Sequence, residues 1–158
     1  MSFLRLSMLA LLAPLLISPL ALADEGSDLG VADPKFADFI RAVAKITAQA
    51  ETKDKSAVKF ICLALNSSGQ VVVTSLSVGS DHGQSFTPSP GAAAIAHFHN
   101  STMSPKPEAA DFDSLRALKL PSFVVSAAGD QIWEVAIIGG SKKYRAVLES
   151  GLGEWMAF

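Results

Sequence analysis

The expected fold depends on the stretch AAAIAHFHNSTMSPKPEAAD, residues 92–111. Its first part, 92–98, consists mostly of small and apolar residues, which is typical of a central strand. Because side chains alternate along a strand, His97 and His99 face one side, and Phe98 faces the core on the other. The end of the stretch belongs to a segment, 108–119, that can form a helix. We therefore expect a strand, a loop and a helix, with two imidazoles at the strand end.

The sequence on either side of this stretch predicts one further helix and four further strands. Asp33-Pro34 is typical of a helix start, and apolar residues recur at helical spacing after it. The other segments are apolar and β-prone, with turn signals between them. The expected elements are a helix over 34–50 and strands over 58–65, 71–76, 122–126 and 132–138, with a long loop rich in Gly, Ser and Pro over 79–91.

This order of elements predicts one α/β domain over residues 34–158. We expect a sandwich in which helices flank a mostly antiparallel central sheet. The C-terminal residues 144–158 carry several large apolar side chains and are expected to pack onto that sheet. The single cysteine, Cys62, lies in an apolar strand, so we interpret it as a core residue rather than as a nucleophile.

The N-terminal residues 1–23 have the pattern of a secretory signal peptide. Arg5 supplies a basic start, an apolar run follows, and Ala21-Leu22-Ala23 forms a small-x-small cleavage site. An uncleaved membrane anchor is the alternative, but two prolines interrupt the run. We expect an exported protein, periplasmic or secreted, that begins with a flexible arm over 24–33 and has no membrane span after cleavage.

The charge balance of the chain argues against a nucleic-acid partner. The whole sequence carries a net charge of −2, and loss of Arg5 with the signal peptide makes it one unit more negative. A protein that neutralises phosphates needs a basic face, which this composition does not favour.

Three side chains of the 92–111 stretch form a candidate zinc site. His97 and His99 project together from the strand end, and Asp111 enters from the first turn of the following helix. Three protein ligands with one open position are the pattern of catalytic zinc. Asp113 is a substitute ligand with a less suitable spacing, and we interpret His82 as a residue of the 79–91 loop.

This segment resembles the JAB/MPN (JAMM) metallopeptidases, which carry His-x-His, a loop and then Pro-Ser-x-x-Asp. Eleven residues separate His99 from Asp111, as is usual in that family, and Pro107 takes the proline position. The order of elements over 34–138 is also similar. The resemblance implies an exported bacterial type of the JAB/MPN (cytidine deaminase-like) sandwich, with one Zn²⁺ ion held by His97, His99 and Asp111.

Two residues differ from the family pattern. Glu108 stands where the family has the serine that helps to hold a developing oxyanion, and Asn100 replaces a common proline. The family also needs a glutamate as general base near its first strand. Glu51 is the candidate, with a solvated helix end as its alternative interpretation, and Glu108 is a second candidate that could equally favour the helix dipole.

The resemblance implies a hydrolase that cleaves an amide, peptide or isopeptide bond with metal-activated water. For an exported protein, the expected substrate is a peptide or a cell-envelope amide. The departure at Glu108 favours an alternative: a catalytically silent binding or inhibitory module of the immunity type, whose partner is an exported protein. The sequence leaves both hypotheses open.

A cupin barrel is a third interpretation of the histidines. Gly91 lies six residues before His97, and Gly-x5-His-x-His begins a cupin motif. A cupin needs a glutamate four or five residues after the second histidine, where this chain has Met103 and Ser104. The pattern therefore favours the JAMM interpretation.

Overall fold

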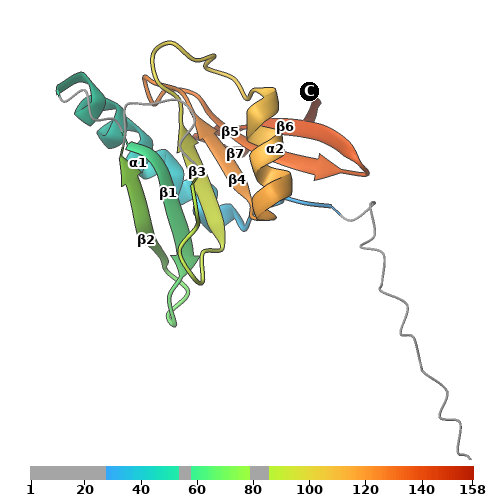
Figure 1. Cartoon of the computed structure of the whole chain (residues 1–158), viewed down its shortest axis with the longest axis horizontal. Coiled ribbons are helices and arrows are strands. Elements are labelled where there is room, and N and C mark those ends of the chain that lie inside the picture. Colours follow the sequence, from blue (N-terminus) through green and yellow to red (C-terminus); the bar gives the residue numbers. More distant parts are fainter. Residues whose placement is uncertain (1–27, 54–57, 79–85) are drawn as a thin grey trace, which may run out of the picture.

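The computed structural model describes residues 28–53, 58–78 and 86–158 (Figure 1). The expected signal peptide, 1–23, and His82 lie outside these residues. Within them, no helix is both long and apolar enough to cross a membrane.

The described residues form one eight-stranded sheet with a helix on each face (Figure 1). The strand order is β2-β1-β3-β4-β5-β6-β7, and β8 pairs with β6 beside β7. The strands are β1 (Val58–Leu65), β2 (Val71–Val78), β3 (Ala94–Phe98), β4 (Ser122–Val125), β5 (Ile132–Ile138), β6 (Ser141–Leu148), β7 (Gly151–Leu152) and β8 (Met156–Ala157). The helices are α1 (Pro34–Lys53) and α2 (Ala109–Leu118).

The parallel pair at the centre of the sheet determines where the site lies. β3 and β4 run parallel, whereas the other paired strands are antiparallel. Parallel neighbours need a crossover connection, which here contains α2. The crossover leaves the sheet at the carboxyl end of β3, so the first turn of α2 is brought back near that strand end.

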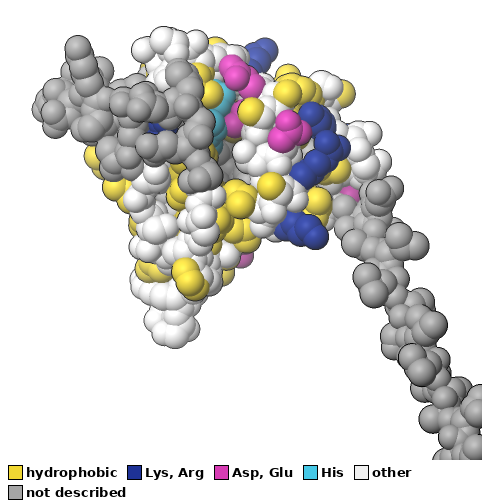
Figure 2. Space-filling model, in the orientation of Figure 1, with side chains coloured by type: hydrophobic (Ala, Val, Ile, Leu, Met, Phe, Trp, Pro, Cys, Tyr) yellow, Lys and Arg dark blue, Asp and Glu magenta, His cyan; other side chains and the backbone are white. Residues whose placement is uncertain are grey.

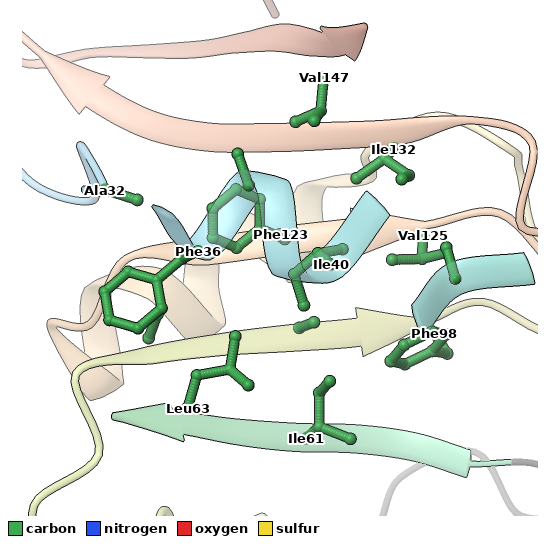
Figure 3. Packing of buried hydrophobic residues seen from close by; sticks show 14 residues of the cluster. Ala32, Phe36, Ile40, Ile61, Leu63, Phe98, Phe123, Val125, Ile132 and Val147 are labelled. Carbon is green, nitrogen blue, oxygen red and sulfur yellow. The ribbon is translucent and has the colours of Figure 1, made fainter. Parts of the chain in front are cut away.

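Alternating side chains of β4 divide the core between the two faces. Phe123 and Val125 pack with Phe36 and Ile40 of α1, as the close-up of this cluster shows (Figure 3). Val124, between them in sequence, packs on the other face with residues of α2. Because each face buries an apolar layer, the architecture is an α/β sandwich with a mostly antiparallel sheet, as the sequence predicts.

The element boundaries differ little from those expected. α1 continues to Lys53 instead of ending near residue 50, and β2 extends to Val78. The expected C-terminal segment does join the sheet, but as strands that the sequence did not predict. β6, SKKYRAVL, is rich in charged residues, so its period-2 pattern is weak. The expected core residue Cys62 is fully buried.

Residues 28–33, which we expected in a flexible arm, are attached to β5. Leu29 exchanges backbone hydrogen bonds with Ile137. The N–H of Ala32 donates to Oε1 of Glu134 at 2.8 Å. Gly30 has a φ of +90°, and a Cβ there would lie 2.8 Å from the carbonyl oxygen of Val135. The polar composition of this segment did not indicate these contacts, because they are made by its backbone.

Candidate metal centre

The two histidines of the candidate site lie where β3 ends. Ala96 and Phe98 belong to the core on the α1 side, so His97 faces α2. The N–H of His99 donates to the carbonyl of Val125 at 2.8 Å, which continues the parallel pairing one residue past the strand. The His99 side chain is fully buried, whereas 23% of the His97 side chain is exposed. Figure 2 shows a histidine at the surface on this face, with acidic side chains beside it.

Asp111, in the first turn of α2, meets both imidazoles. Its Oδ1 lies 2.8 Å from Nδ1 of His97. Its Oδ2 lies 3.4 Å from Nε2 of His99. The backbone N–H of Glu108 also donates to Oδ2 at 2.7 Å, so the carboxylate is fixed to the start of its own helix. The three side chains therefore converge from a strand end and a helix start.

A backbone contact determines which nitrogen of His99 faces the carboxylate. Nδ1 of His99 lies 2.6 Å from the carbonyl oxygen of Ser104, to which it donates a hydrogen bond. This bond leaves Nε2, on the side of Asp111, as the nitrogen that can carry a lone pair. Such an outer hydrogen bond is the usual means of fixing the tautomer of a metal-binding histidine.

The loop between β3 and α2 is fastened at two further points. Oε1 of Glu108 accepts a hydrogen bond of 3.0 Å from the backbone N–H of Ser104. Nε1 of Trp133, on β5, donates to the carbonyl of Pro105 at 2.9 Å. The loop therefore presents the Ser104 carbonyl to His99 from a fixed position.

The pKa values of the buried pair shift in opposite directions. Burial lowers the pKa of His99, but hydrogen bonds to Asp111 and Ser104 and the Asp111 charge outweigh it, so this pKa lies above its ordinary 6.5. Burial raises the pKa of Asp111, but hydrogen bonds from His97, His99 and Glu108 outweigh it and hold this pKa well below its usual range. Both shifts favour a charged His99–Asp111 pair in the metal-free protein.

The donor set fits a metal ion. One donor atom from each of His97, His99 and Asp111 can be chosen so that all lie within 4.8 Å of one another. Two ligands of a tetrahedral zinc ion, each about 2.1 Å from it, lie about 3.4 Å apart. The separation between His99 and Asp111 already matches, whereas the 2.8 Å contact of His97 would have to open slightly. These residues form a triad able to bind a metal.

The structure does not show the other predicted site residues as part of this triad. Asp113 is 69% exposed and lies 3.9 Å from Lys142, so it does not substitute for Asp111. Glu51 lies in the last turns of α1, but its side chain is outside the described residues, and its role stays a prediction. The Glu108 carboxylate braces the loop, and its catalytic role also stays a prediction.

Sequence reasoning missed the residues that hold the ligands. The Ser104 carbonyl and Trp133 act through backbone contacts or across the sheet, so no motif indicates them. Phe60, on β1, is the partner of His97 in the antiparallel pairing and stacks on its ring. Alternation along β1 could have predicted that Phe60 lies on the same sheet face as His97. It could not have predicted that the two residues are cross-strand neighbours, because the register was unknown.

A scan against protein-family models and searches of curated proteins and of solved structures found no match to this chain. Fold and site together define an α/β sandwich with a His-His-Asp triad at the carboxyl end of a central strand. The resemblance to the JAMM metallopeptidases stays a prediction that depends on residues 97–111.

Proposed function

We propose that this protein is an exported zinc-dependent hydrolase of the JAMM type, with a JAB/MPN-like fold. One observation carries the proposal: two imidazoles and a carboxylate converge at the start of a helix and the end of a parallel strand. A structural zinc site would be closed by four protein ligands, and the described residues supply three donors here.

Zinc is the metal that suits this donor set best. Imidazole nitrogen and carboxylate oxygen are ordinary zinc ligands, and a harder ion such as Mg²⁺ prefers an all-oxygen site. When bound, zinc supplies a Lewis acid that lowers the pKa of a water molecule to about 7.

The residues of this chain would divide the remaining tasks. His99, through Nε2, and Asp111 form the buried side of the site, and the more exposed His97 faces the approach of a substrate. The carboxylate of Glu51 would accept a proton from the attacking water, as the family resemblance implies. The Glu108 carboxylate is a second candidate for that proton, although it already accepts from the Ser104 N–H.

The proposed substrate is a peptide or an amide of the cell envelope, because export would bring the enzyme to such bonds. This part of the proposal depends on cleavage of the N-terminal segment after Ala23. N-terminal sequencing of the protein recovered from outside the cytoplasm would test it. We expect the mature chain to begin at Asp24, and an intact N-terminus in the cytoplasmic fraction would contradict export.

Metal analysis and amide hydrolysis test the central proposal. The purified protein should contain about one zinc per chain, and His97→Ala should lose both metal and turnover. Glu51→Gln should keep the metal but lose turnover about 100-fold or more, because a general base contributes that much. Asp111→Asn should lose metal and turnover as His97→Ala does, and Asp113→Asn is its matched control, since both aspartates lie on α2 and only Asp111 belongs to the triad. Absence of metal, or activity retained in both His97→Ala and Glu51→Gln, would refute the hydrolase.

A second candidate function is a catalytically silent binding or inhibitory module of the immunity type, acting on an exported protein. The position of Glu108 favours it, because a loop-bracing carboxylate stands where the family has its oxyanion-stabilising serine. This candidate predicts bound metal without turnover on any amide substrate. Hydrolysis by the purified protein that a chelator abolishes would rule it out.

A further inference from the structure

Three aromatic rings form a stacked column beside the triad. Phe60 of β1 lies between two parallel rings, those of His97 and Phe86. The Phe60 and His97 centroids are 4.5 Å apart with 10° between the ring planes. The Phe60 and Phe86 centroids are 4.6 Å apart with 12° between the planes. β1, β3 and the connection that precedes β3 therefore contribute to this column, and one of its rings is a predicted metal ligand.

The column arises from strand register. Phe60 and His97 are direct partners in the antiparallel β1–β3 pairing, so their side chains project side by side on the α2 face. Phe86, in the connection from β2 to β3, covers the far side of the Phe60 ring. α2 itself packs over β4 and β5, so the face of the His97 ring is covered from β1, and the helix contributes only the Asp111 hydrogen bond at the ring edge.

Two partners, Phe60 and Asp111, together fix the orientation of the His97 ring. A stacked ring opposes rotation of the imidazole out of its plane, but it does not distinguish the two ring edges. The hydrogen bond from Nδ1 to Asp111 selects the edge. A metal ion would replace that hydrogen bond, so the stack would remain as the support of the ring plane. The neighbouring imidazole of His99 touches His97 edge-on, with centroids 4.8 Å apart.

We propose that Phe60 is a positioning residue of the metal centre, which fixes the ring plane of His97, and that Phe86 supports it from the β2–β3 connection. The inference rests on the proposed metal function of the triad. In this role Phe60 acts through His97 and does not itself contact the substrate. Outer residues that orient metal ligands typically change metal affinity 10- to 100-fold when substituted.

The test compares Phe60→Leu with Phe60→Tyr in the full mature chain. Leucine keeps an apolar side chain but removes the flat face, whereas tyrosine keeps the ring. Zinc affinity, measured by competition with a chromophoric chelator, should fall about tenfold or more in Phe60→Leu and stay near wild type in Phe60→Tyr. The visible spectrum of the Co²⁺-substituted protein should change in Phe60→Leu alone, because the ligand geometry relaxes.

Phe39→Leu is the matched control, because Phe39 is also a half-buried phenylalanine but packs against the α1 core. It should lower stability without changing zinc affinity or the Co²⁺ spectrum. If Phe60→Leu does not fold, Phe86→Leu replaces it and should weaken zinc binding in the same direction. Unchanged affinity and spectrum in the folded variant would overturn the positioning role while leaving the metal function intact.

A metal-free measurement separates this inference from the proposed function. If the wild-type protein binds no metal, the zinc function fails, and the orientation of His97 can still be followed by NMR of its ring. Loss of the stack should weaken the Nδ1 hydrogen bond to Asp111 in Phe60→Leu, which the His97 Nδ1 nitrogen resonance reports. An Nδ1 resonance identical in wild type and Phe60→Leu would refute the positioning role.

Discussion

Asp111 links every part of the candidate site at the scale of single residues. Its two carboxylate oxygens contact two imidazoles and the backbone N–H that begins α2. The same carboxylate is the main cause of the raised pKa of the buried His99, together with the hydrogen bond to Ser104. A proton and a metal ion therefore compete for the same nitrogen, Nε2 of His99.

This competition predicts opposite pH dependences for stability and for metal affinity. The raised pKa of His99 stabilises the metal-free fold below 6.5, and that contribution is lost as pH rises through the folded pKa. The lowered pKa of Asp111 stabilises the fold above 3.8, and that contribution is lost as pH falls through its folded pKa. With respect to this pair, the metal-free protein should be most stable between these two ordinary values.

Zinc affinity should instead rise with pH as His99 loses its proton, because the metal needs the neutral ring. Urea denaturation and zinc titration from about pH 3 to about pH 9 would measure both trends, a range that spans the ordinary pKa values of the pair. Asp111→Asn should flatten the stability profile, since it removes the partner that raises the His99 pKa. Asp113→Asn should leave the pH profile of stability unchanged. A profile that Asp111→Asn does not change would contradict the role of Asp111 in raising the His99 pKa.

At the scale of elements, hydrogen bonds hold the β3–α2 loop to His99, to Glu108 and to Trp133. Its Ser104 carbonyl orients His99, the Glu108 carboxylate holds the Ser104 N–H, and Trp133 holds the Pro105 carbonyl. The loop connects the two elements that carry the triad. Its geometry therefore determines the distance between the histidines and Asp111.

Glu108→Ala should destabilise the protein by about 1 kcal/mol, the usual net value of one lost hydrogen bond. It should also speed amide hydrogen exchange at Ser104 and weaken zinc binding. Glu108→Gln retains an acceptor for the Ser104 N–H and should behave like wild type in all three measurements. Equal behaviour of the alanine and glutamine variants would show that the carboxylate does not brace the loop.

At the scale of the whole molecule, a buried ion pair fastens the N-terminal segment and the C-terminal strands to the sheet. Glu134 of β5 is fully buried, and its Oε2 accepts a hydrogen bond of 2.8 Å from Nε of Arg145 on β6. The other oxygen accepts from the N–H of Ala32. Arg145 also lies over the Trp155 ring, 4.3 Å from its centroid. The pair therefore connects residues from both ends of the described chain.

Glu134→Ala should lower the free energy of unfolding by about 3–5 kcal/mol, because it leaves Arg145 without its partner in a nearly buried position. Replacing both residues, as Glu134→Leu with Arg145→Met, should cost less than Glu134→Ala alone, since no unpaired charge remains. Urea denaturation of the three proteins measures this difference. A loss below about 1 kcal/mol in Glu134→Ala, the range of surface pairs, would contradict it.

The sequence predicted most of the elements near the site because their signals are local. Residues 58–65 and 132–138 are apolar, β-prone runs between turn signals, and both form the expected strands. β6 escaped prediction because its lysines and arginine break the apolar alternation, and its pairing with β5 and β8 compensates for that. The sequence also did not predict the attachment of residues 28–33, because backbone groups make most of its contacts and leave no side-chain pattern.

The sequence by itself determined which side chains of the site share a direction. Alternation along β3 places His97 and His99 on one face, and Asp111 lies in the first turn of the helix that follows. Only the tertiary structure decided that these donors meet, and that Phe60 stacks on His97. The physical reason is that periodicity fixes the facing of a residue within its element, whereas strand order, register and the path of a crossover depend on packing across the whole sheet.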